Sequence, residues 1–285
     1  MRLDDLRRSD NIEDRRGMGG RPLALGGGGL LVVLLVAWLF GANPLTLLQE
    51  IGGSNSTSSV SQPSETTTSP EEEKTKDFVA AVLGETEDVW RQEFAKQGKQ
   101  YREPKLVLFS GAVESGCGNA RAATGPFYCP GDEKIYLDMT FFREMSEGLG
   151  ATGDFAQAYV IAHEVGHHVQ KLLGISDKVE AMRARMSEQE YNQVSVRLEL
   201  QADFFAGVWA RHADETEKIL EQGDLEEALN AASSIGDDRL QKRSQGYVVP
   251  DAFTHGTSEQ RVRWFKRGYE TGDITQGDTF SAREL

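Results

Sequence analysis

Residues 162–169 read Ala-His-Glu-Val-Gly-His-His-Val and lie within a run, residues 154–173, whose apolar side chains recur at helical spacing. Residues four apart lie on one face of an α-helix, so His163 and His167 can direct two imidazoles at one metal ion. Glu164 lies about 80° around the helix from that pair. There, a carboxylate can take a proton from a water that the metal activates. The alternative is a helix with two partly exposed histidines and a surface glutamate.

A second predicted helix, residues 194–209, contributes two carboxylates. It is apolar on most sides and should be buried, yet Glu199 and Asp203 lie four apart on one face. Buried carboxylates are costly unless they are paired or bound to a metal. Pairing with Arg197 or another base, or a solvated face, is the alternative to a metal.

One zinc ion would join the two helices. Catalytic zinc takes three protein ligands and keeps a fourth position for water, and His163, His167 and Glu199 can form such a His₂Glu set. Asp203, one turn further along, could accept a hydrogen bond from the free ring nitrogen of a ligating histidine and so orient it. In the metzincin pattern a third histidine would occupy the position of Leu173, so that pattern is absent.

These motifs, residues 163–167 (His-Glu-Val-Gly-His) and 198–203 (Leu-Glu-Leu-Gln-Ala-Asp), resemble those of zincin metallopeptidases with a glutamate ligand, the gluzincins. The closest likeness is to the neutral zinc metallopeptidase family of membrane-anchored bacterial proteins, which residues 253–264 also resemble. The spacing of Glu199 and Asp203 is similar to that of CAAX-processing and heat-shock metalloproteases. The resemblance implies a zincin-like domain that binds zinc and hydrolyses protein or peptide substrates.

Three other residues could support the site, and each also has a structural explanation. His255 precedes a predicted helix, residues 258–269, and could be the catalytic donor that stabilises an oxyanion; a loop histidine that caps or packs is the alternative. Tyr159 could line the cleft or pack in the core, and His168 could support the site or lie on the surface. His212 ends the second helix, where the helix dipole favours a cation.

Length and charge exclude some classes of function. The 285 residues suffice for one sizeable domain with extensions, and the net charge is −14. An acidic chain is a poor candidate for nucleic-acid binding, which needs basic patches.

An apolar segment near the N-terminus predicts a membrane crossing. Residues 23–40 carry no charge. Six arginines lie before them in residues 1–22, and the next lysine or arginine after them is Lys74. A bilayer crossing needs roughly 17–25 residues, and the charge asymmetry predicts a cytoplasmic N-terminus and an extracytoplasmic domain in a single-pass protein of the cell membrane. A cleaved signal peptide and a buried core helix are the alternatives.

The expected organisation has four parts: a cytoplasmic basic tail (1–22), a transmembrane helix (23–42), a membrane-proximal segment with a flexible Ser/Thr-rich tether (43–76), and a zinc metallopeptidase domain (77–285). Within that domain, spacing predicts a helix over 77–97, with a possible break at Gly84, strands within 104–111 and at 134–138, and a short helix over 139–147. Few strands and many helices indicate an α+β fold.

Cys117 and Cys129 are the only cysteines. In an extracytoplasmic domain they can form a disulfide, which would stabilise the fold by roughly 2–4 kcal/mol. A pair of metal thiolates is the alternative.

Together these features predict a membrane-anchored zinc peptidase in which Glu164 is the general base. The alternative from another class is a membrane-tethered binding or scaffold protein with a zincin fold and no turnover. An intact Glu164 argues against it, since a structural zinc site needs no base. Hydrolysis of a non-peptide substrate at the same metal is a third possibility.

Overall fold

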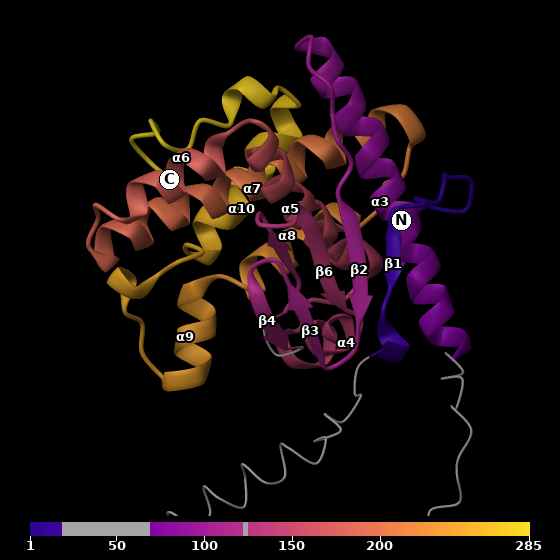
Figure 1. Ribbon diagram of the computed structural model, residues 1–285, viewed down its shortest axis with the longest axis horizontal. Helices are drawn as coiled ribbons and strands as arrows, with labels where there is room; N and C mark the ends of the chain where they lie inside the picture. Colours follow the sequence, from indigo (N-terminus) through magenta and orange to yellow (C-terminus); the bar gives the residue numbers. More distant parts are fainter. Residues whose placement is uncertain (19–68, 122–124) are drawn as a thin grey trace, which may run out of the picture. The chain divides into compact units, whose positions relative to one another are not determined.

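The computed structural model describes residues 1–18, 69–121 and 125–285 (Figure 1). The chain divides into two units, Met1–Arg16 together with Thr68–Leu285, and Gly17–Thr67. The first unit is mostly helical with a small sheet, which confirms the predicted α+β class.

The elements follow one another in this order: β1 (Ile12–Asp14), η1 (Arg16–Met18), α3 (Pro70–Lys96), β2 (Lys105–Phe109), β3 (Ala112–Ser115), β4 (Gly118–Arg121), β5 (Phe127–Cys129), β6 (Lys134–Asp138), α4 (Thr140–Leu149), α5 (Asp154–Leu172), α6 (Ile175–Arg183), α7 (Glu188–Glu217), α8 (Asp224–Ser234), α9 (Asp237–Gln245), η3 (Pro250–Ala252), α10 (Ser258–Thr271) and η4 (Ile274–Gln276).

A four-stranded sheet has the order β1-β2-β6-β5. β1, β2 and β6 are parallel, whereas β5 pairs antiparallel to β6 and forms one edge. Alternate residues of a strand point to opposite faces. Leu106 and Leu108 of β2 therefore join the large core beneath the helices, while Val107 and Phe109 join a smaller apolar cluster on the other face. β3 and β4 form a separate hairpin.

Helices α5, α7 and α10 lie side by side and form the helical layer that holds the candidate site (Figure 1). Helix α5 has the predicted bounds within a residue. Helix α7 begins after Ser187, whose side chain and that of Glu190 form a capping box, and it extends well past the predicted segment 194–209 at both ends. Both helices are buried around the middle, as their apolar composition requires.

Helix α3 begins earlier than predicted. Ser69 caps it, Pro70 occupies the first turn, and Glu72 completes a capping box, so the helix starts within the segment expected to be a tether. The possible break at Gly84 is not observed. A Cβ at Gly84 would lie 2.6 Å from the carbonyl oxygen of Arg7, so glycine is needed there for close passage of the N-terminal segment.

Residues 1–16 are part of this unit, which corrects the expectation of a separate basic tail over 1–22. β1 pairs in parallel with β2, and the Arg15 amide donates to the Leu108 carbonyl at 2.8 Å. The fully buried carboxylate of Glu87 accepts hydrogen bonds from Ser9 and from Asn11, at 2.5 and 2.9 Å. The arginine-rich segment is therefore held by acidic partners of the domain.

This pairing also bears on the predicted orientation. A single crossing by residues 23–42 would separate β1 from β2 by a bilayer, which their shared backbone hydrogen bonds do not allow. A cytoplasmic 1–22 with an extracytoplasmic domain therefore does not agree with this packing. The predicted crossing itself falls on residues outside those described, and among the described residues no helix is both long and apolar enough to span a membrane.

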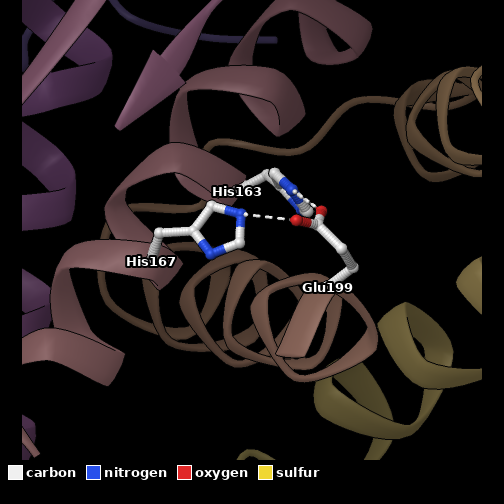
Figure 2. Close-up of side chains that lie close together, drawn as sticks. All are labelled: His163, His167 and Glu199. Carbon is white, nitrogen blue, oxygen red and sulfur yellow. Dashed lines mark hydrogen bonds and ion pairs between the residues drawn. The ribbon is translucent and has the colours of Figure 1, made fainter. Parts of the chain in front are cut away.

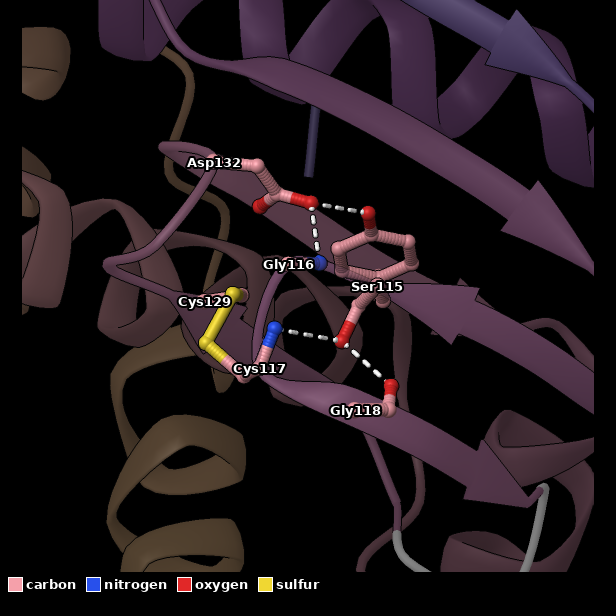
Figure 3. Close-up of a disulfide and its surroundings, with 7 residues drawn as sticks. Ser115, Gly116, Cys117, Gly118, Cys129 and Asp132 are labelled. Carbon is pink, nitrogen blue, oxygen red and sulfur yellow. Dashed lines mark hydrogen bonds between the residues drawn. A yellow bond between two sulfur atoms is a disulfide. The ribbon is translucent and has the colours of Figure 1, made fainter.

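The predicted disulfide between Cys117 and Cys129 is present (Figure 3). It joins the turn between β3 and β4 to the end of β5. The same turn is held by Asp132, whose carboxylate accepts a hydrogen bond from the Gly116 amide at 2.7 Å. Since β5 is an edge strand, this link fixes the strand beside the candidate site.

Candidate metal centre

Close approach of α5 and α7 creates the site. A Cβ at Gly166 would lie 2.9 Å from the carbonyl oxygen of Ala202 and 3.1 Å from its Cα, closer than side chains tolerate. Glycine at position 166 therefore lets the two backbones meet at this level. Because of that approach, Glu199 on α7 lies opposite His163 and His167 on α5 (Figure 2).

The three predicted ligands come together. Glu199 Oε2 lies 3.1 Å from His163 Nε2, and Glu199 Oε1 lies 3.5 Å from His167 Nε2. All three ligand atoms lie within 4.8 Å of one another. Tetrahedral zinc with bonds of about 2.0–2.2 Å has neighbouring ligand atoms about 3.3–3.6 Å apart. The donor set and its spacing thus fit zinc.

Asp203 contacts the other ring nitrogen of His163, as predicted. Its Oδ1 accepts a hydrogen bond from His163 Nδ1 at 2.8 Å, which leaves Nε2 directed at Glu199. The carboxylate is completely buried. Burial opposes its ionisation, but Arg261 and His163 outweigh burial and lower the pKa of Asp203 to about 2.

His167 is oriented by a residue that the sequence analysis missed. Gln170 Oε1 accepts from His167 Nδ1 at 2.9 Å. The Gln170 amide nitrogen donates to the Leu198 carbonyl at 2.7 Å and to the side-chain oxygen of Gln201 at 3.1 Å. Gln170 therefore has for His167 the role that Asp203 has for His163. Its position three residues after a predicted ligand is the signal that could have indicated it.

Without a metal, the site favours protons on its histidines. Burial lowers the pKa of His163, but the Asp203 carboxylate and hydrogen bonds to Asp203 and Glu199 outweigh it and raise the pKa to about 10. The pKa of His167 is also raised, because Glu199 outweighs its burial. Metal binding requires neutral imidazole, so zinc would displace protons here.

Glu164 lies beside the triad and is only 7% exposed. It lines the same cleft as the three ligands. It makes no hydrogen bond to any residue that the structure describes. Its carboxylate is therefore available to a molecule in the cleft, as a general base must be.

The cleft has a volume of about 740 Å³ and a largely apolar wall. One side comes from the segment around β5, which the disulfide holds. The rest comes from α4, α5, α6, α7, α9, α10 and the loop residues Ile235 and His255. Its lining includes Phe127, Tyr128, Phe141, Val179, Glu180 and Leu198. A cleft of this size that is open to solvent suits a ligand larger than water.

His255 also lines the cleft, with its side chain half exposed. Asp237, at the start of α9, accepts hydrogen bonds from the backbone amides of Thr254, His255 and Gly256 at 2.7, 2.6 and 3.0 Å. The hydrogen bond with Asp237 raises the pKa of His255, partly offset by burial. An imidazole with a raised pKa, whose backbone amide is held by Asp237, thus faces the cleft. Asp237 is a second residue that sequence reasoning missed.

The remaining candidates have structural partners. Tyr159 and His163 both contact Asp203, so Tyr159 belongs to the site rather than only to the core. His168 is fully buried, and its two ring nitrogens contact the Tyr128 hydroxyl and the Arg102 carbonyl, which places it neither on the surface nor against a ligand. His212 contacts the carbonyl of Gly272 at 2.8 Å.

The base proposed as an alternative partner for the two carboxylates is not Arg197. Its guanidinium donates to the carbonyls of Thr279, Phe280 and Ala282. Asp203 instead pairs with Arg261 on α10, at 2.8 Å from Nε. The alternative of an ion pair therefore holds for Asp203. Among the described residues, the carboxylate of Glu199 has hydrogen-bond or ion-pair contacts only with the two histidines.

Comparisons with known proteins identify a family and relatives of this chain. The family model described as "Putative neutral zinc metallopeptidase" matches residues 1–280. "Uncharacterized protein YpfJ" of Escherichia coli K12 is 51% identical over 292 residues, covering 98% of this chain and 99% of that protein. "Uncharacterized protein Rv2575" of Mycobacterium tuberculosis is 44% identical over 195 residues, or 65% of each chain. No solved structure matches.

Proposed function

Since the chain belongs to the family of putative neutral zinc metallopeptidases, we propose that it hydrolyses peptide bonds in protein or peptide substrates with one zinc ion. The observation that carries this proposal is the convergence of His163, His167 and Glu199 beside the unpartnered carboxylate of Glu164, in an open cleft. A zincin-like fold is part of this proposal, and the α+β class of the described residues supports it.

Each residue has a defined task in the proposed reaction. His163, His167 and Glu199 would hold zinc, which when bound polarises the scissile carbonyl and lowers the pKa of a water. Glu164 takes a proton from the attacking water and transfers it to the leaving amine. His255, whose pKa is raised by its hydrogen bond with Asp237, donates a hydrogen bond to the developing oxyanion.

The scaffold alternative is less well supported. A structural zinc site is normally closed by four protein ligands, whereas a catalytic site keeps an open position. Here three candidate ligands converge on the wall of a cleft. The neighbouring carboxylate of Glu164 makes no hydrogen bond to any residue that the structure describes. A purely structural site would require neither feature.

The test is cleavage of a peptide library by zinc-loaded protein, compared with Glu164→Gln. Removal of a general base typically costs about 10²–10⁴-fold in rate, so turnover should nearly vanish while zinc remains bound. Glu180→Gln is the matched control, because Glu180 lines the same cleft but is exposed. Equal cleavage by wild type and Glu164→Gln would refute the base. Zinc binding without cleavage by the wild type would favour the scaffold.

We also propose membrane attachment through residues 23–42, on the support of the sequence alone. The expected behaviour is retention in the membrane fraction after alkaline washing and release by detergent. Release by alkali would contradict it.

A further inference from the structure

A buried arginine stands behind the candidate zinc site. Arg261 on α10 is only 2% exposed. Its guanidinium donates two hydrogen bonds to the carboxylate of Asp203, from Nε to Oδ2 at 2.8 Å and from Nη2 to Oδ1 at 2.9 Å. Such a two-pronged, charge-assisted pair fixes both the position and the rotation of a carboxylate.

Tyr159 completes the surroundings of the carboxylate. Its hydroxyl donates to Asp203 Oδ1 and accepts from Arg261 Nη2 at 3.3 Å. Asp203 thus receives hydrogen bonds from Tyr159, Arg261 and His163. Tyr159 and Arg261 are not candidate metal ligands. Their hydrogen bonds hold Asp203 in the position where it contacts the ring of His163.

Glycines determine how α10 meets α7. A Cβ at Gly207 would lie 2.1 Å from the carbonyl oxygen of Phe265, and a Cβ at Gly268 would lie 2.0 Å from that of Phe204. The two backbones therefore touch, which a larger residue at either position would prevent. This contact sets the register that brings Arg261 onto Asp203.

Fold stability alone does not explain the pair. Replacing a buried ion pair by apolar residues of similar volume is often neutral or stabilising, so such a pair is weak evidence for a stabilising role. Removing only one partner, however, leaves an uncompensated buried charge. What distinguishes this pair is its contact with a histidine whose other nitrogen faces the zinc ligand Glu199.

We propose that Arg261, with Tyr159, is a positioning residue for zinc binding: it holds Asp203 so that His163 keeps its proton on Nδ1 and presents Nε2 to the metal. This inference rests on the proposed zinc site but not on turnover. Supporting contacts of this kind typically contribute about 10–100-fold to metal affinity.

The experiment measures zinc affinity of the folded full-length chain by competition with a chromophoric chelator. Arg261→Met should weaken zinc binding by about 10–100-fold, with a smaller loss for Arg261→Lys, which keeps the charge but not the fork. Tyr159→Phe should also weaken it. Arg263→Met is the matched control, since Arg263 lies on the same helix, is exposed and pairs with Glu259.

A double-mutant cycle tests the route of the effect. If Arg261 acts through Asp203, then Asp203→Asn combined with Arg261→Met should bind zinc no more weakly than Asp203→Asn alone. Wild-type affinity in folded Arg261→Met, or equal losses with and without the Asp203 carboxylate, would overturn the proposal. Should Arg261→Met fail to fold, unchanged affinity in both Arg261→Lys and Tyr159→Phe would overturn it. Tight zinc binding by a wild type that cleaves nothing would count against the proposed function alone.

Discussion

Gly166, inside the histidine motif, allows a direct test of how α5 and α7 form the metal site. In Gly166→Ala, the added Cβ would lie 2.9 Å from the Ala202 carbonyl oxygen, whereas ordinary contact begins at 3.4 Å, so α5 and α7 must separate by about 0.5 Å. Metal–ligand distances tolerate only about 0.2 Å of change. The ligands on α5 would therefore no longer match Glu199 on α7.

Stability should change much less than zinc binding. Overpacking costs about 1–3 kcal/mol, but alanine is favoured over glycine within a helix by about 1 kcal/mol, so the two partly cancel. Gly148→Ala in α4 is the control, because a Cβ there meets nothing within 4 Å. It should leave zinc affinity unchanged and slightly raise stability.

The assay combines thermal unfolding of the metal-free protein with zinc affinity by chelator competition. Gly166→Ala should lose at least about tenfold in zinc affinity, in line with disturbed metal-supporting contacts, while remaining folded. Wild-type affinity in Gly166→Ala would refute the reasoning that close helix approach creates the site.

Three further predictions concern protonation, the oxyanion donor and the N-terminal segment. The pKa of His163 is raised to about 10 in the metal-free fold; it therefore contributes stability that is complete below about pH 6.5, its unfolded value, and lost as pH rises toward 10. Thermal unfolding in chelator should show this decline, and His163→Ala should show a smaller one, because the pKa of His167 is raised as well; a flat wild-type profile would contradict the assignment. His255→Ala should lower kcat/KM by about 10²–10³-fold with zinc affinity unchanged, and wild-type kinetics would remove His255 from the mechanism. Ser9→Ala deletes a donor to the buried Glu87 carboxylate and should destabilise the protein by about 1–3 kcal/mol in denaturant unfolding; no change would favour a detached N-terminal tail.

Local patterns predicted the centre of the molecule well. The run of apolar residues in α5 and the alternation in β6 are determined by what each segment buries, so their bounds were readable from spacing. The same holds for the ligand set, because residues four apart on a helix share a face whatever surrounds them.

Contacts between segments far apart in the sequence could not be predicted in the same way. β1 consists of three residues, Ile12–Asp14, in a charged stretch without strand periodicity, and it forms only because β2 offers an edge. The burial of Arg261 depends on the contact of α10 with α7 at Gly207 and Gly268, which no single helix reveals. The start of α3, in contrast, could have been predicted from local sequence. Ser69, Pro70 and Glu72 form a helix-capping pattern, but it lies in a polar stretch that was expected to be a tether.

The central claim, zinc-dependent peptide hydrolysis at this site, is tested most directly by titrating metal-free protein with Zn²⁺ while following peptide cleavage. We predict no cleavage without metal, a rise in rate in proportion to added zinc, and saturation at one zinc per chain, with Glu199→Ala unable to reach that rate at the same zinc concentration. Cleavage that persists without metal, or its absence at every zinc concentration in a protein that binds the ion, would contradict the claim.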